Sequence, residues 1–248
     1  MSINKMIEDA VEVSQHAQRN YDLSKTIPDN DLKTLIHAAT NSPSKQNESH
    51  FELAVYTDIQ KIRKVYDQTK LFMVRSKEEN NDLSKLWSEQ NGKTWQSEDR
   101  SIKNSQILAN SLFVFIDYAG SAVGGTHQLA QRDPQNHPTR VKLYDEQRNY
   151  SVGIAVGELI LSATLLGYKT GICSAFHPNK VKDIIGCEGK VKLLVGIGYA
   201  NDGIDRRLHA ETLNKDLPEL FQNGSPNDPW RFPALTKNLK ISLNDENI

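Results

Sequence analysis

The chain has 248 residues, of which 38% are hydrophobic and 25% charged, a balance typical of a globular protein rather than a disordered one. Thirty basic and 31 acidic residues give a formal net charge of −1, so no overall positive field favours nucleic acid or an anionic membrane. Two cysteines and seven histidines without ligand spacing predict neither a disulfide framework nor a metal site. No apolar run is long enough for a membrane span or a secretory signal, so we expect a cytoplasmic location.

The first half of the chain predicts alternating helices and strands. Apolar residues at helical spacing indicate helices over 3–14 and 31–39, the second capped by Asp29. A strand is expected over 51–57 and a helix over 59–66. Residues 76–100 are strongly polar, and we interpret them either as a solvated helical insertion or as a substrate lid.

The second half contains the expected core. Residues 112–116 form a continuous apolar run, which predicts a central strand buried on both faces, and residues 120–140 read as a long loop. Residues 152–166 are apolar almost all round the helical circle, so this helix should be covered on most sides, as the spine of a fold or of a dimer. Strands over 169–173 and 190–199 flank a helix over 177–185, and a Pro-rich tail after 207 is expected to wrap a partner subunit.

Three segments carry a resemblance to a known family. They are His16 to Pro28, the polar turn Asn41 to Asn47, and the helix, strand and loop from Ser151 to Phe176. The turn alone reads equally well as a helix end before a strand. The ordered set resembles the nitroreductase family of flavoproteins. This resemblance implies an α+β fold with a mixed central sheet flanked by helices, in a domain-swapped type of homodimer. It also implies a single domain over 1–248, with excursions near 60–105 and 119–148 and an arm after about 208.

The resemblance also implies flavin mononucleotide (FMN) as cofactor and NAD(P)H as transient donor. It assigns cofactor binding to His16, Ala17, Arg19, Pro43, Ser44, Lys45, Asn47, Ser105, Ile172, Cys173, Ser174, Ala175, Arg206 and Arg207. Arg206 and Arg207, with His16, would hold the phosphate, although Gln15 and Ala17 stand where the family has Arg and Ser. The phosphate clamp is therefore thinner than the family's or is completed elsewhere. On the residues alone, the two arginines are better read as a solvated pair after a strand.

The remaining assignments concern the flavin ring. Arg19 would place a positive charge near N1 and O2, which stabilises the reduced ring, or would be a cation at a helix C-terminus. The backbone N–H of Ser174 would point at N5, and Cys173 is expected to be a buried small hydrophobe rather than a reactive thiol. The turn from Pro43 to Asn47 would reach a flavin bound mainly by the partner subunit.

The implied activity is hydride transfer from NAD(P)H through the flavin to a nitroaromatic, a quinone or a similar small acceptor. The cofactor performs this chemistry, so no catalytic side chain is predicted. Two alternatives stay open: a flavin-consuming or dehalogenating enzyme on the same fold, and a flavin-binding protein without turnover.

Overall fold

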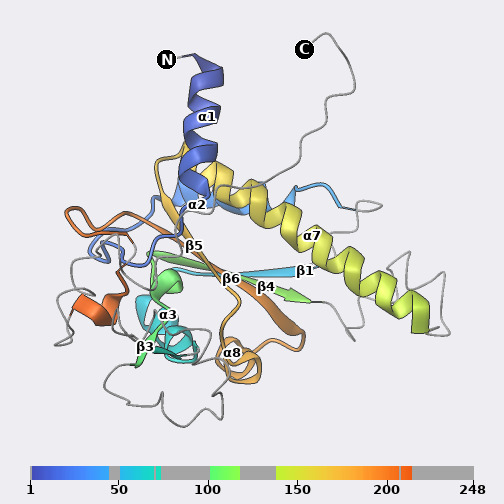
Figure 1. Cartoon of the computed structure of the whole chain (residues 1–248). Coiled ribbons are helices and arrows are strands. Elements are labelled where there is room, and N and C mark those ends of the chain that lie inside the picture. The colour runs from blue at the N-terminus through green and yellow to red at the C-terminus, as the bar shows by residue number, and fades with distance from the viewer. Residues whose placement is uncertain are drawn as a thin grey trace, which may run out of the picture.

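The computed structural model describes residues 2–44, 51–69, 71–73, 101–117, 138–206 and 208–213 (Figure 1). Its centre is a four-stranded sheet in the order β1-β4-β6-β5, in which every described pairing is antiparallel. The strands are β1 (Phe51–Tyr56), β4 (Ser111–Asp117), β5 (Lys169–Cys173) and β6 (Lys190–Gly198). A separate two-stranded ribbon, which was not expected, joins β2 (Leu71–Met73) to β3 (Ser101–Lys103).

Helices cover both faces of the sheet. They are α1 (Ile3–Ser14), α2 (Asp29–Thr40), α3 (Ile59–Tyr66), α7 (Pro138–Leu165) and α8 (Pro178–Ile185), with the 3₁₀ helices η3 (Ser105–Ile107) and η5 (Ala210–Leu213). Helices α2 and α7 lie on one face, and α3 and α8 lie on the other (Figure 1). The α+β class is therefore confirmed, and so are the predicted strands and helices, within a few residues at their ends except for the start of α7.

Strand β4 joins the two halves of the core. Phe113 and Phe115 point into the cluster under α2 and α7, while Leu112, Val114 and Ile116 point into the cluster under α3 and α8. All five side chains are fully buried, as the continuous apolar run predicts for a strand covered on both faces. Burial of each side chain this size contributes roughly 1.5–3 kcal/mol to folding.

The expectation of a mixed sheet is wrong for the described pairings, and the connection through α7 explains why. Strands β4 and β5 run in the same direction and are joined by α7, which is the pattern that predicts a parallel pair. However, β6 is inserted between them and is antiparallel to both. The strand at the resulting edge of the sheet is β5.

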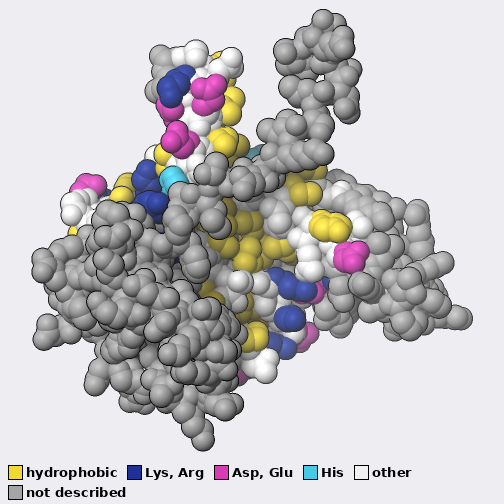
Figure 2. Space-filling view, in the orientation of Figure 1, with side chains coloured by type: hydrophobic (Ala, Val, Ile, Leu, Met, Phe, Trp, Pro, Cys, Tyr) yellow, Lys and Arg dark blue, Asp and Glu magenta, His cyan; other side chains and the backbone are white. Residues whose placement is uncertain are grey.

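Helix α7 is longer than predicted and is covered on one side. It begins at Pro138, so residues 138–140, which were expected in a loop, are helical. Its buried side consists of Val152, Ala155, Val156, Leu159, Ile160 and Ala163. On the other side Tyr150 is 59% exposed and Ile154 is 43% exposed, so a single chain leaves that side open. Figure 2 shows hydrophobic side chains along one side of α1 and in a patch below it.

The start of α2 also differs from the prediction. Asp29 is the first helical residue rather than the cap, and the cap position is held by Pro28, which makes no side-chain hydrogen bond. The fixed φ of proline suits a helix start, and Asp29 and Asp31 in the first turn complement the helix dipole. The segment 76–100 and most of 120–140 lie outside the described residues. Among the helices described, none combines the length and the apolar character that a bilayer crossing needs.

Candidate functional site

Three segments that are distant in the sequence meet at the beginning of β5. The backbone N–H of Gln18 donates to the carbonyl of Thr170 at 2.8 Å, and the N–H of Arg19 donates to the carbonyl of Arg206 at 2.9 Å. Arg206 returns a hydrogen bond from Nη1 to the carbonyl of Ala17 at 3.1 Å. The extended segment 16–19 is therefore held between β5 and the loop 200–206.

Gly171 allows this close approach. A Cβ atom added there would lie 2.7 Å from the carbonyl oxygen of Gln18, and closer still to that of Gln106. A larger residue would push the segment 16–19 and η3 away from β5. Close packing against these two carbonyl oxygens thus explains why a glycine stands in the middle of the strand.

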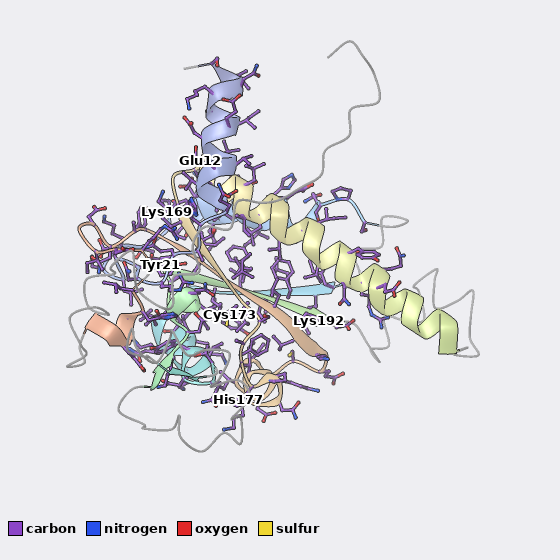
Figure 3. The ribbon with its side chains drawn as sticks, in the orientation of Figure 1. Glu12, Tyr21, Lys169, Cys173, His177 and Lys192 are labelled. Carbon is purple, nitrogen blue, oxygen red and sulfur yellow. The ribbon has the colours of Figure 1, made fainter. Side chains whose placement is uncertain are left out.

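A pocket of about 300 Å³ opens where the three segments meet. Its lining residues are Val13, His16, Gln18, Lys169, Ala200, Ile204 and Arg206. The structure therefore brings together His16 and Arg206, two of the residues predicted to hold a phosphate. Figure 2 shows Lys or Arg side chains beside a His side chain at the foot of α1, and Figure 3 places Lys169 and Glu12 in that region.

The electrostatics of the pocket are dominated by cations. Burial lowers the pKa of His16 below its usual value, the positive charge of Arg206 lowers it further, and the carboxylate of Glu12 opposes both effects. His16 is thus mainly neutral at pH 7, and the N–H of its ring can donate a hydrogen bond to an anion. The ammonium of Lys169 makes no hydrogen bond or ion pair with another residue in the described ranges.

Arg19 is held from behind by a buried polar cluster. The hydroxyl of Ser105 donates to the carbonyl of Arg19 and accepts from the N–H of Ala210 at 2.9 Å. The backbone N–H of Ser105 donates to Nδ1 of His209 at 3.2 Å. Ser105 is fully buried. The structure therefore gives its hydroxyl a supporting position behind Arg19, whereas the resemblance assigned it to the flavin ring.

The outer edge of β5 offers backbone groups. The carbonyl of Thr170 points away from β6 and accepts from Gln18. In an antiparallel pair every second residue points its backbone groups to the same side, so those of Ile172 also point away from β6. The same alternation, continued along the extended chain, applies to Ser174. Ile172 is 41% exposed and Ser174 is exposed, while Cys173 is buried. The backbone N–H of Ser174 donates to no other residue of the described chain.

Cys173 behaves as the sequence suggested. Its side chain is 1% exposed and accepts a hydrogen bond from Nδ2 of Asn104 at 3.1 Å. Burial raises the pKa of its thiol, so it stays protonated at neutral pH. Ala175, which follows in the loop, is partly buried. Cys187 is likewise a free thiol.

The polar turn is only partly described. Ser42 is buried and its hydroxyl donates to the carbonyl of Ala39 at 3.2 Å, while Pro43 is exposed and Ser44 is half-buried. Lys45, Asn47 and Arg207, which were predicted to bind the cofactor, lie outside the described residues. In the described ranges, no cluster of His, Cys, Asp and Glu could hold a metal ion.

Two residues of this region were missed from the sequence. Lys169 precedes an apolar strand and reads there as a solvated strand end, and its position in the pocket depends on the contact between β5 and the segment 16–19. His209 belongs to no local pattern, and only the folded chain brings it to Ser105. A charge at the first position of a buried strand was the one local signal for Lys169.

A comparison with family models identifies one family. The nitroreductase family model matches residues 13–199. Similar solved structures include nitroreductase family proteins from Clostridium novyi NT (TM-score 0.51, 16% identity, 84% of this chain and 90% of that chain) and Streptococcus pneumoniae TIGR4 (TM-score 0.53, 15% identity, 82% and 93%).

A BluB-like flavoprotein from Clostridium difficile 630 has a TM-score of 0.54 and 15% identity, over 83% of this chain and 93% of that chain. No curated protein matches the chain. At these identities the solved structures establish the fold alone. The family match extends over well more than half of the sequence. The chain belongs to the nitroreductase family.

Proposed function

We propose that this protein is an FMN-dependent oxidoreductase that passes hydride from NAD(P)H through the flavin to a nitroaromatic, a quinone or a similar small acceptor. Membership of the nitroreductase family supports the proposal. The observation that carries the proposal is the set of groups that lie together beside β5, at one edge of the sheet. The cationic pocket, Arg19 and the outward backbone of Ile172 and Ser174 all adjoin β5.

The donor set fits the chemical parts of FMN. His16, Lys169 and Arg206 supply cationic and neutral donors suited to a phosphate dianion. Arg19 supplies a positive charge from a backbone position that is held by Ser105 on one side and by Arg206 on the other. Ser174 supplies a backbone N–H at the sheet edge.

These residues bind and orient rather than exchange protons with a substrate. Bound FMN supplies the hydride chemistry through its N5 atom. Arg19 stabilises negative charge on the ring by preorganised electrostatics, and the N–H of Ser174 fixes the orientation of a hydrogen-bond acceptor. The thiol of Cys173 stays protonated and buried, so we assign it no role in proton transfer.

The proposal includes a cytoplasmic homodimer with the turn 43–47 and the arm after about 208 contributed across subunits. The open side of α7 supports an assembly, because Tyr150 and Ile154 are exposed there and a Cβ added to Gly153 or Gly157 meets no atom of a described residue within 4 Å. On α1, Ile3 is 72% exposed and Val11 is 52% exposed. Apolar faces of this kind are typical of protein interfaces.

Stopped-flow mixing tests the function directly. Purified protein should be yellow and should release FMN on heating, identified by chromatography. Anaerobic mixing with NADH or NADPH should bleach the visible flavin absorbance, and an added nitroaromatic or quinone should restore it. A colourless preparation that ignores added FMN would contradict flavin binding. If neither nucleotide bleaches the bound flavin, the reductase activity is contradicted and the protein binds flavin without turnover.

A further inference from the structure

Lys169 is the positively charged residue of the pocket whose charge has no described counter-ion. It is the first residue of β5, pairs with Gly198 of β6, and is half-buried. Its ammonium forms no ion pair with any residue that the structure describes. Lys169 therefore supplies the pocket with an ammonium that is available to an anion arriving from outside the chain.

The backbone around Lys169 is fixed by contacts that do not depend on an anion. The neighbouring residue Thr170 accepts the hydrogen bond from Gln18, and the β5 ladder holds Lys169 opposite Gly198. Arg206 is tied to Ala17 from across the pocket. The two cationic side chains therefore line the same cavity from two separate segments, as a site for a multiply charged anion requires.

The charge balance of the pocket remains positive. The carboxylate of Glu12 acts on His16, but the described lining of the pocket itself contains the two permanent cations Lys169 and Arg206 and no acidic residue. The residues at which a family phosphate clamp was expected are neutral: Gln15 is exposed at the end of α1, and Ala17 has no polar side-chain atom. A positive charge that replaces the family's arginine in binding a phosphate must therefore come from another element.

We propose that Lys169 is a phosphate contact for FMN in this chain, completing with Arg206 and His16 the clamp that Gln15 and Ala17 cannot form. The inference rests on the proposed function, since it assigns a residue to the same flavin. It predicts that Lys169 affects recognition of the phosphate and leaves recognition of the ring unchanged. Riboflavin, which carries the same ring without the phosphate, separates the two effects.

Flavin binding by matched lysine variants tests the assignment. Protein freed of flavin by dialysis is titrated with FMN and with riboflavin, and quenching of flavin fluorescence gives each Kd. In Lys169→Met the Kd for FMN should rise roughly 10- to 100-fold, because one charge-assisted contact is lost, while the Kd for riboflavin stays unchanged. Lys169→Arg should retain most of the preference for FMN. The control is Lys190→Met, which removes an exposed lysine at the first position of β6 and should bind both flavins as the wild type does.

The outcomes distinguish this assignment from the proposed function. A wild-type protein that binds neither flavin would contradict the function itself. A wild-type protein that binds both flavins equally, or a Lys169→Met variant that keeps the preference for FMN, would overturn the role of Lys169 and leave flavin binding intact.

A second measurement needs no variant. Lysine acetylation followed by peptide mass spectrometry should show that FMN protects Lys169 while riboflavin does not, with Lys190 equally reactive in both samples. Equal acetylation of Lys169 in the presence of the two flavins would contradict the assignment, even if the methionine variant did not fold.

Discussion

Nδ1 of His209 lies 3.2 Å from the backbone nitrogen of Ser105, and this contact joins the chain after β6 to the element before β4. Because Nδ1 accepts the Ser105 N–H, that nitrogen cannot carry a proton without losing the bond. Burial lowers the pKa of His209 to about 3, with the positive charge of Arg19 as the second cause. The region behind Arg19 thus depends on a neutral histidine.

The first prediction is a loss of stability in mild acid. Below about pH 6.5 the unfolded chain takes up a proton at His209 that the folded chain does not. The free energy of unfolding therefore decreases as the pH is lowered from about 6.5 to about 3. Between pH 7 and pH 5 the loss from this group should be roughly 2 kcal/mol. In His209→Asn, the amide oxygen can still accept from Ser105 and does not titrate. Urea unfolding of both proteins at the two pH values should show the smaller loss in the variant, and equal losses would contradict the assignment.

The second prediction concerns a buried carboxylate at the end of β4. Asp117 has a side chain only 2% exposed and lies 2.9 Å from both Arg148 Nε and Lys192 Nζ. Asp117→Asn removes the negative charge and leaves both cations facing a neutral amide, so it should lower the free energy of unfolding by roughly 3 kcal/mol. Asp183→Asn, at an exposed position of α8, is the matched control and should change it by less than about 0.5 kcal/mol. Similar denaturation midpoints for the two variants would show that the ion pairs contribute little.

The third prediction tests the charge at Arg19. Arg19→Ala should weaken FMN binding roughly 10- to 100-fold, since one charge-assisted contact is lost. It should also lower the midpoint potential of the bound flavin, by an amount on the order of 30 mV for a two-electron couple. Dye-equilibrated reduction of the bound flavin measures the potential. Arg19→Lys keeps the charge and should keep most of the potential, and an unchanged potential in the alanine variant would argue against contact with the ring.

The fourth prediction tests the assembly. In Gly157→Leu the new side chain points into space that no described residue fills, so the monomer should be as stable as the wild type or slightly more stable through helix propensity. A partner packed on this side of α7 would be displaced, and sedimentation velocity should then show monomers in place of dimers. Asn179→Leu on the exposed side of α8 is the control and should remain dimeric. A variant at Gly157 that still sediments as a dimer would place the interface elsewhere.

Local patterns predicted the elements better than their arrangement. The apolar run at 112–116 indicated β4, and the ends of α3 and β5 were placed at the residues where the structure has them. No local pattern shows that β6 enters between β4 and β5, because strand order depends on contacts between distant residues.

The candidate site shows the same division. A family pattern selected His16 and Arg206, and the fold brings both to one pocket. Lys169 and His209 were missed, since each acquires its neighbours through tertiary contacts, between β5 and the segment 16–19 and between η3 and residue 209. Cofactor binding by Ser105 stays a prediction, and its hydrogen bond to the carbonyl of Arg19 is a contact that only the packing of η3 reveals.

The insertion of β6 has a consequence for how the molecule is made. During synthesis β5 emerges before β6, the strand to which it pairs, so the ribosome must release residues 190–198 before β5 can join the sheet. Nascent chains that end before residue 190 would hold α7 and β4 but could not yet hold the cationic pocket. The pocket can therefore form only late in synthesis, after translation has passed β6 and the residues Ala200, Ile204 and Arg206 that also line it.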